Sequence, residues 1–89
     1  MDFEWDPKKA RSNQAKHGVS FEEATQVFGD EYALELYDNS EGEERFVIIG
    51  RVGIAVLVVV YTERNARIRI ISARRATARE EEAYYEQAN

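Results

Sequence analysis

The side chains of this sequence that most strongly suggest a chemical role are arginines concentrated in one stretch. Residues 51–79 contain seven Arg and one acidic residue, Glu63. Residues 1–50 contain five Lys or Arg against twelve Asp or Glu, and residues 80–89 contain four Glu and no base. Because the planar guanidinium binds phosphate through two parallel hydrogen bonds, the stretch indicates an anion-binding surface, although the whole chain has a net charge of −5.

The arginines alternate with isoleucines from Arg67 to Ile70, which is typical of a strand with one buried face. Continued alternation would place Ser72 and Arg74 on the isoleucine side. We therefore expect a β-bulge near Ile71, where one extra residue resets the alternation. The residues then expected on the open face are Arg67, Arg69, Ser72 and Arg74, joined by Arg51 and Arg64 from the ends of neighbouring strands.

Two interpretations of this arginine cluster are open. The first is anion binding, which would relieve the repulsion between guanidinium groups on one face. The second is pairing with Glu43, Glu44, Glu63 and the Glu80–Glu82 run in exposed ion pairs, each contributing about 0–1 kcal/mol. The one-sided, lysine-free composition favours anion binding.

His17 is the one side chain of a type that ordinarily titrates near neutral pH, with a pKa of about 6.5. It could therefore transfer a proton in a reaction. Alternatively, it serves as a cation in the last turn of a helix, where it stabilises the helix end by about 0.3–1 kcal/mol. With one His and no Cys, we expect no metal site and no cofactor.

The aromatic residues have two expected roles. Tyr84 and Tyr85 could stack on bases or donate a hydroxyl, and at least one of them is expected to pack on the sheet. The remaining large aromatics are assigned to the core, and these are Phe3, Trp5, Phe21 and Phe28.

Local signals predict three helices. Asp6 and Pro7 begin a helix over 7–17 that ends at Gly18. Ser20 and Glu23 form a capping box for a second helix that ends at Gly29-Asp30, and Thr77 and Glu80 form another for a C-terminal helix.

Between the second and third helices, period-two patterns predict four strands, with Phe3–Trp5 as a short additional strand or an extended segment. The four strands begin at Glu31, Arg45, Ile54 and Arg67, and the polar tract 39–43 is expected to be a turn. Residues Ile54 to Thr62 are almost all apolar and are expected to form a central strand covered on both faces. The predicted fold is an α+β domain with an antiparallel β-meander of four to five strands, two N-terminal helices and one C-terminal helix, with the helices on one face.

The 89 residues suit one domain, 1–89, with a single core. Without cysteine, a reducing cytosol is the expected compartment. The N-terminus lacks the features of a signal peptide, and the longest apolar run is too short for a membrane span.

Taken together, several short segments of the chain resemble the BrnT family of toxins. They are 3–9, Asn13 with 16–21, Gly50-Arg51, 59–64 and 71–76, which follow one another in the family's order. The resemblance implies a RelE-like fold and a metal-independent ribonuclease that is held inactive by a DNA-binding BrnA-type antitoxin, which also represses the operon. The acidic Glu80-Glu81-Glu82 departs from the basic residues often found there in the family.

The activity that the resemblance implies would let the ribose 2′-OH attack the adjacent phosphate. This requires a base, cations for the developing charge, and an acid for the leaving oxygen. The expected catalytic residues are His17, Arg64, Arg69 and Arg74, with a tyrosine of the last helix as an alternative to His17. The expected substrate-binding residues are Lys9, Lys16, Arg51, Arg67, Ser72, Arg75 and Tyr84. The rival hypothesis is a module that binds RNA or its antitoxin without cleaving RNA.

Overall fold

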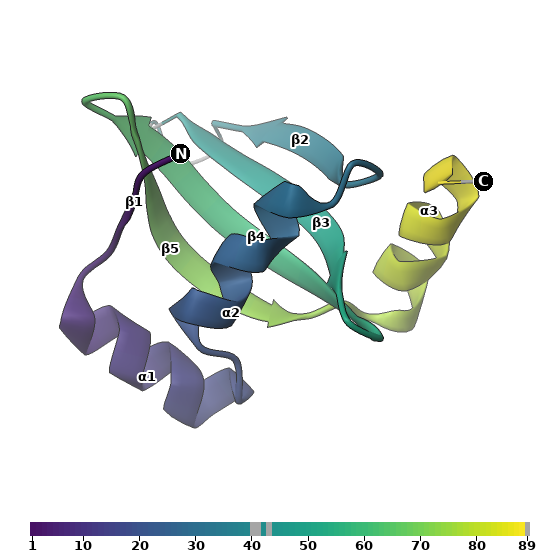
Figure 1. Ribbon diagram of the computed structural model, residues 1–89, viewed down its shortest axis with the longest axis horizontal. Helices are drawn as coiled ribbons and strands as arrows, with labels where there is room; N and C mark the ends of the chain where they lie inside the picture. Colours follow the sequence, from purple (N-terminus) through teal and green to yellow (C-terminus); the bar gives the residue numbers. More distant parts are fainter. Residues whose placement is uncertain (40–41, 43, 89) are drawn as a thin grey trace.

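The computed structural model describes residues 1–39, 42 and 44–88. Within these residues, five strands form one sheet in the order β1-β5-β4-β3-β2 (Figure 1). The four longer strands form the predicted antiparallel meander, while β1 (Phe3–Glu4) runs parallel to β5 at the edge. The longer strands are β2 (Leu34–Asp38), β3 (Arg45–Val52), β4 (Ala55–Arg64) and β5 (Arg67–Arg75). The predicted α+β fold is confirmed.

The helices begin and end largely where the capping residues predict. In α1 (Pro7–His17), the Asp6 side chain accepts a hydrogen bond from the Lys8 backbone N–H, and Gly18 ends the helix in the left-handed conformation at φ 71°. The Ser20–Glu23 capping box opens α2 (Phe21–Thr25), which is shorter than predicted. Its last turn tightens into a 3₁₀ helix, η1 (Gln26–Gly29).

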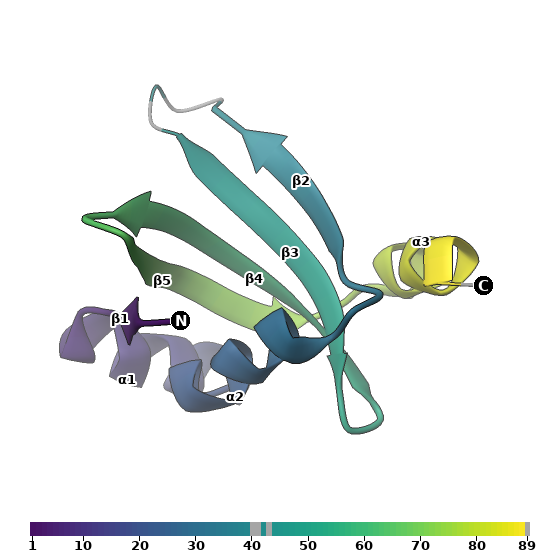
Figure 2. The same cartoon turned by 45° about the horizontal axis from the view of Figure 1, so that its top comes forward.

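The main hydrophobic core lies between one face of the sheet and the helices α1, α2 and η1 (Figure 2). Phe21 and Val27 from the helical segment pack with Val59 and Ile70 of the sheet, and all four are fully buried. β4 is the middle strand, and residues 56–59 are buried on both faces, as predicted for a central strand.

The prediction that all helices lie on one face is wrong. Helix α3 (Ala78–Ala88) packs at one end of the opposite face, where its Tyr84 joins Ile49, Val56 and Val58 in a second cluster (Figures 1 and 2). The physical reason is the composition of the inner strands. Their side chains are apolar on both faces, so the second face also needs a cover.

Strand β2 does not have the predicted buried face. It begins at Leu34, later than predicted, and Tyr32, Leu36 and Tyr37 are each about half exposed. The strand lies at the edge of the sheet with β3 as its one neighbour in the described sheet, so few groups are available to cover it. Part of the turn predicted at 39–43 lies outside the described residues.

The tip of the β3–β4 hairpin also differs from the prediction. Ile54, expected as the first residue of the strand, lies in the two-residue turn and is fully exposed. Its neighbour Gly53 has φ 63°, a backbone conformation that favours glycine.

The β4–β5 turn contains two residues with positive φ, Asn65 at 53° and Ala66 at 64°. Alanine is strained there by contact of its Cβ with the backbone. We expect Ala66→Gly to raise the free energy of unfolding by about 1 kcal/mol, measured by urea unfolding. Gly53→Ala is the matched reverse change and should lower it by a similar amount. A neutral or destabilising effect of Ala66→Gly would contradict the strain.

Candidate active site

Strand β5 contains the predicted bulge. Ser72 pairs with Val60 and Ile70 pairs with Tyr61, so Ile71 is the extra residue with no partner in the ladder. The side chains of Ser72 and Arg74 therefore return to the sheet face that carries Arg67 and Arg69, as predicted.

Strand β1 pairs with Ile68 and Arg69 of β5. Beyond Arg69, helix α1 lies along this edge of β5 in place of a further strand. The Asn13 side chain makes the connection, and it is 8% exposed. Its Nδ2 donates to the Ala73 carbonyl at 2.8 Å and to the Val19 carbonyl at 3.1 Å, and its Oδ1 accepts from the Ala73 N–H at 3.2 Å. Asn13 thus fixes α1 beside the bulge.

A groove of about 220 Å³ lies between α1 and the bulge, and we call it the α1–β5 groove. Lys9, Ser12 and Lys16 line it from one face of α1, since positions three, four and seven apart lie on the same side of a helix. Asn13, His17 and Ser72 are its other polar lining residues. Four residues predicted for the site, Lys9, Lys16, His17 and Ser72, therefore meet in one place. Two ammonium groups, an imidazole and a hydroxyl can bind a phosphate and move a proton.

Two arginines predicted for catalysis, Arg69 and Arg74, are paired with carboxylates, and so is Arg67, which was predicted for substrate binding. Arg69 Nη1 lies 3.1 Å from Glu4 Oε2, and Arg67 Nη1 lies 3.8 Å from the other oxygen of Glu4. The two terminal nitrogens of Arg74 donate to the two oxygens of Glu80 at 2.7 and 2.8 Å. The Arg74–Glu80 pair agrees with the alternative interpretation of the cluster, whereas Arg67 and Arg69 pair with Glu4, which was not among the expected partners.

The remaining arginines do not form one cluster. Arg64 and Arg67 face each other beside the β4–β5 turn, but Arg51 pairs with Val56 at the other end of β4. Arg64 lies eight positions after Val56, which corresponds to about 26 Å of strand. The expectation that Arg51 joins Arg64 is wrong, because β3 and β4 are antiparallel and their C-terminal residues therefore lie at opposite ends of the sheet. Arg75 alternates to the face opposite that of Arg74.

Tyr84 is 3% exposed, and its hydroxyl donates to Asp30 Oδ2 at 2.6 Å. Burial, together with this hydrogen bond, raises the pKa of Tyr84 to about 12. Burial alone would raise the pKa of Asp30, but the hydrogen bonds from Tyr84 and from the backbone N–H groups of Arg51 and Tyr32 outweigh it and lower that pKa. Tyr84 joins α3 to the sheet, and we leave it out of the substrate-binding residues.

The Arg74–Glu80 pair predicts a dependence of stability on pH. The hydrogen bonds from Arg74 lower the pKa of Glu80 from 4.5 to about 2, and Glu80 also accepts from the Thr77 N–H in the predicted capping box. A carboxyl whose pKa is lowered by folding stabilises the protein above its unfolded pKa, and this contribution is lost as the pH falls from about 4.5 through 2.

We therefore expect Glu80→Gln to reduce the free energy of unfolding at pH 7 by about 2 kcal/mol, after allowing for solvent screening of a partly exposed pair. The variant should also flatten the loss of stability between pH 4.5 and 2, as measured by urea unfolding over that range. Glu81→Gln, on the exposed side of α3, is the control and should change stability by less than about 0.5 kcal/mol. Parallel pH profiles for Glu80→Gln and the unmodified protein would contradict this role.

Asn13 and Asp30 were not predicted as organising residues from the sequence. A signal for Asn13 was available, because asparagine is a poor helix former and its place inside α1 indicates another role. Asp30 follows a helix end, where a carboxylate is ordinary, and its partners Tyr84 and Arg51 are far away in the sequence.

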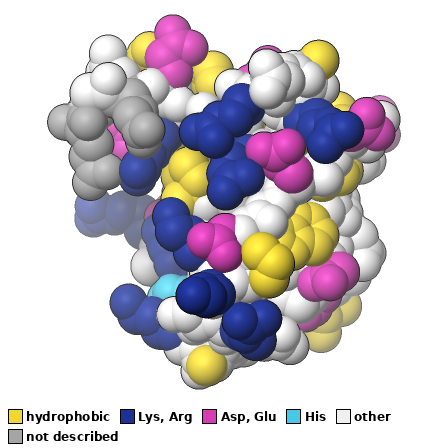
Figure 3. Space-filling view, turned by 90° about the vertical axis from the view of Figure 1, so that its left-hand side faces the viewer, with side chains coloured by type: hydrophobic (Ala, Val, Ile, Leu, Met, Phe, Trp, Pro, Cys, Tyr) yellow, Lys and Arg dark blue, Asp and Glu magenta, His cyan; other side chains and the backbone are white. Residues whose placement is uncertain are grey.

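Positive charge is concentrated on one side of the described part of the molecule. Lys and Arg side chains gather on the side that carries α1 and the β4–β5 turn, with the histidine among them (Figure 3).

No group of His, Asp and Glu in the described part of the chain could hold a metal ion. None of the helices in that part is long and apolar enough to cross a membrane.

The structure is that of a small α+β domain with a basic groove, containing a histidine, at the edge of its sheet. A groove of this kind is suited to binding a polyanion such as RNA. A family model describing the ribonuclease toxin BrnT of type II toxin–antitoxin systems matches residues 5–80. The chain belongs to this BrnT family, which implies an RNA target and an antitoxin partner. A search of curated proteins found no match.

Proposed function

We propose that this chain is an endoribonuclease that cleaves RNA in the α1–β5 groove. The observation that carries the proposal is the meeting of Lys9, Lys16, His17 and Ser72 around one groove, although α1 and the bulge are separated by more than fifty positions in the sequence. Membership of a family described as ribonuclease toxins supports the reaction class.

In the proposed reaction, the ribose 2′-oxygen attacks the adjacent phosphorus, and the bond from phosphorus to the 5′-oxygen breaks. A base removes the proton of the 2′-OH, and an acid protonates the departing 5′-oxygen. The products are a 2′,3′-cyclic phosphate and a 5′-hydroxyl. His17 is assigned to proton transfer, while Lys9 and Lys16 stabilise the added negative charge of the pentacoordinate phosphorus and Ser72 donates a hydrogen bond to it.

The arginines of the open sheet face are assigned to phosphates next to the cleaved one. Arg64 and Arg67 are exposed near the β4–β5 turn. Arg69 and Arg74 would exchange a carboxylate partner for an RNA phosphate, which keeps each guanidinium hydrogen-bonded in both states. Because the groove carries its own positive charges, we propose that cleavage needs no metal ion.

The test is incubation of the purified protein with RNA in the presence of EDTA, followed by analysis of the product ends. We expect cleavage that leaves 2′,3′-cyclic phosphate and 5′-hydroxyl ends. Cleavage that occurs with added Mg²⁺ and stops in EDTA would contradict the metal-independent mechanism. Intact RNA together with measurable antitoxin binding would favour the rival function, a non-catalytic binding module, which the carboxylate-held Arg69 and Arg74 would suit.

The proposal also specifies the kind of antitoxin that binds this chain. We propose a BrnA-type, DNA-binding antitoxin that forms a hetero-oligomer with this chain in the cytoplasm and represses the operon as the complex. Co-expression should relieve the growth inhibition caused by this chain alone, and growth inhibition that persists with the antitoxin present would contradict the assignment.

A further inference from the structure

A second cavity lies at the end of the sheet away from the β4–β5 turn, between α3 and the 29–33 segment. It has a volume of about 630 Å³, within the range of about 300–1,000 Å³ common for ligand sites. Its lining includes Arg51, Tyr85, Tyr32 and Gln26, and we call it the α3 cavity. It is separate from the α1–β5 groove and shares no lining residue with it.

The walls of the α3 cavity are fixed by contacts between distant parts of the chain. Asp30 accepts the Tyr84 hydroxyl from α3, and its carboxylate also accepts the backbone N–H groups of Arg51 and Tyr32. The Gln87 amide of α3 donates to the Tyr32 carbonyl. The carboxylate of Asp30 is therefore occupied by hydrogen bonds from the protein, and the cavity is formed before any ligand enters.

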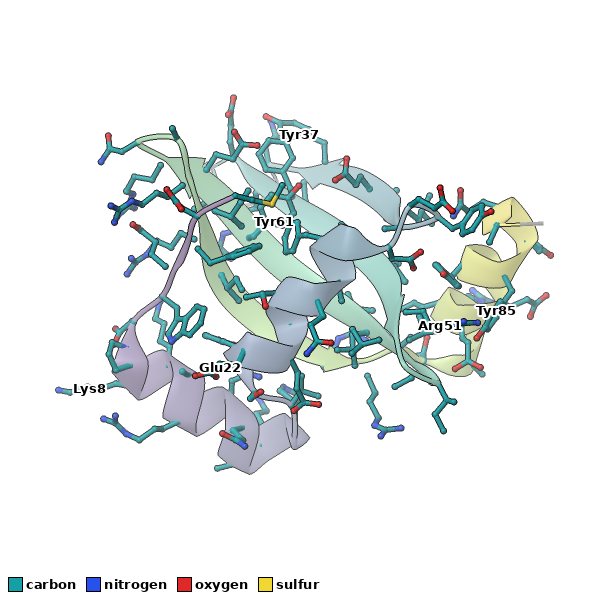
Figure 4. The ribbon with its side chains drawn as sticks, in the orientation of Figure 1. Lys8, Glu22, Tyr37, Arg51, Tyr61 and Tyr85 are labelled. Carbon is teal, nitrogen blue, oxygen red and sulfur yellow. The ribbon has the colours of Figure 1, made fainter. Side chains whose placement is uncertain are left out.

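The groups left for a ligand are a guanidinium and an aromatic ring. No ion pair of the Arg51 guanidinium is found among the described residues, although Asp30 lines the same cavity and the charge of Arg51 helps to lower its pKa. The ring of Tyr85 is 37% exposed and is held edge-to-face by Tyr84, with the ring centres 5.0 Å apart. Figure 4 shows Arg51 and Tyr85 near each other on the side of the molecule that carries α3, and both line the cavity.

We propose that the α3 cavity binds one nucleotide of an RNA strand outside the cleavage site, with a phosphate on Arg51 and the base stacked on Tyr85. A guanidinium beside an exposed ring is the combination that binds single-stranded nucleic acid, since the guanidinium takes the phosphate and any base can stack on the ring. The inference rests on the proposed function, because RNA held in the α1–β5 groove is the strand that would extend to this cavity.

The test compares RNA oligonucleotides of two and twelve nucleotides, with binding of the longer one followed by fluorescence anisotropy. Tyr85→Ala should weaken binding of the twelve-nucleotide RNA about ten-fold, whereas Tyr85→Phe, which keeps the ring, should bind like the unmodified protein. Arg51→Gln should also weaken binding. It should reduce the slope of log K against log salt concentration by about the amount expected for one lost phosphate contact. Cleavage of the dinucleotide should be unchanged in all three variants, because it fills the α1–β5 groove alone.

Two control variants match the side chains that are removed. Tyr37→Ala removes a half-exposed tyrosine from β2, and Arg79→Gln removes an exposed arginine from α3. Each should change affinity for the longer RNA by less than about two-fold, in line with surface changes outside a binding site.

The remaining outcomes separate this inference from the proposed function. Unchanged affinity of Tyr85→Ala for the longer RNA would overturn the inference and leave the nuclease assignment intact. A loss of dinucleotide cleavage as large as the loss of affinity for the longer RNA would also overturn it. Loss of antitoxin binding without loss of RNA binding would do the same. If the unmodified protein binds RNA without cleaving it, the proposed function fails, and a ten-fold loss of binding in Tyr85→Ala would still support the cavity.

Discussion

Replacement of His17 by alanine is expected to reduce kcat for RNA cleavage by about 10²–10⁴-fold, the usual contribution of a group that transfers a proton. His17 lies in the last turn of α1, half-buried, and lines the α1–β5 groove together with Lys16. Its removal leaves in place Lys9 and Lys16, the lysines proposed to bind phosphate. We therefore expect kcat to fall much more than KM changes, as measured under steady-state conditions with a short RNA.

The same histidine lies in the last turn of α1, where a basic residue is expected to stabilise the helix end, so a control must separate the two roles. His17→Lys places a basic residue at the C-terminal end of α1 and should preserve the melting temperature. A lysine remains protonated near neutral pH and cannot act as a base there, so this variant should be as inactive as His17→Ala if His17 removes the proton of the 2′-OH. Full activity of His17→Ala would remove His17 from the reaction.

Replacement of Asn13 by alanine is expected to have the largest effect on stability, lowering the free energy of unfolding by about 3 kcal/mol. The change removes three hydrogen bonds and leaves the N–H and carbonyl groups of Ala73, a fully buried residue, without their partner. Urea unfolding measures the loss. Since Asn13 also fixes α1 beside the bulge, the variant should lose cleavage activity under conditions in which it is still folded.

Asn13→Asp makes the prediction sharper because the two side chains have nearly the same shape. The carboxylate could still accept from the Ala73 N–H, but it would place a negative charge against the carbonyls of Ala73 and Val19. We expect it to destabilise at pH 7 at least as much as alanine does, with partial recovery at low pH as the carboxyl becomes a donor. Gln14→Ala, an exposed neighbour, should change stability by less than about 0.5 kcal/mol, and an equally small effect of Asn13→Ala would contradict the role of its amide.

The ends of the helices and the bulge could be predicted from the sequence because they depend on local groups. Asp6 and Gly18 bound α1 through hydrogen bonds and backbone geometry within a few residues, and Ser20 with Glu23 does the same for α2. The bulge at Ile71 follows from the alternation of polar and apolar side chains in one strand. The sequence also identified four residues of the α1–β5 groove by type, without indicating that they share a groove.

The partners of those residues were decided by the tertiary structure. Which carboxylate holds Arg69 or Arg74, and where Arg51 lies relative to Arg64, depend on strand order and on the direction of each strand. The sheet face covered by α3 depends on which apolar surface remains exposed once the meander has formed. Composition and periodicity determine what a segment forms and which side of it is buried, because those forces act over a few residues. The contacts that build a site join segments that are distant along the chain, and only the packing of the whole sheet brings them together.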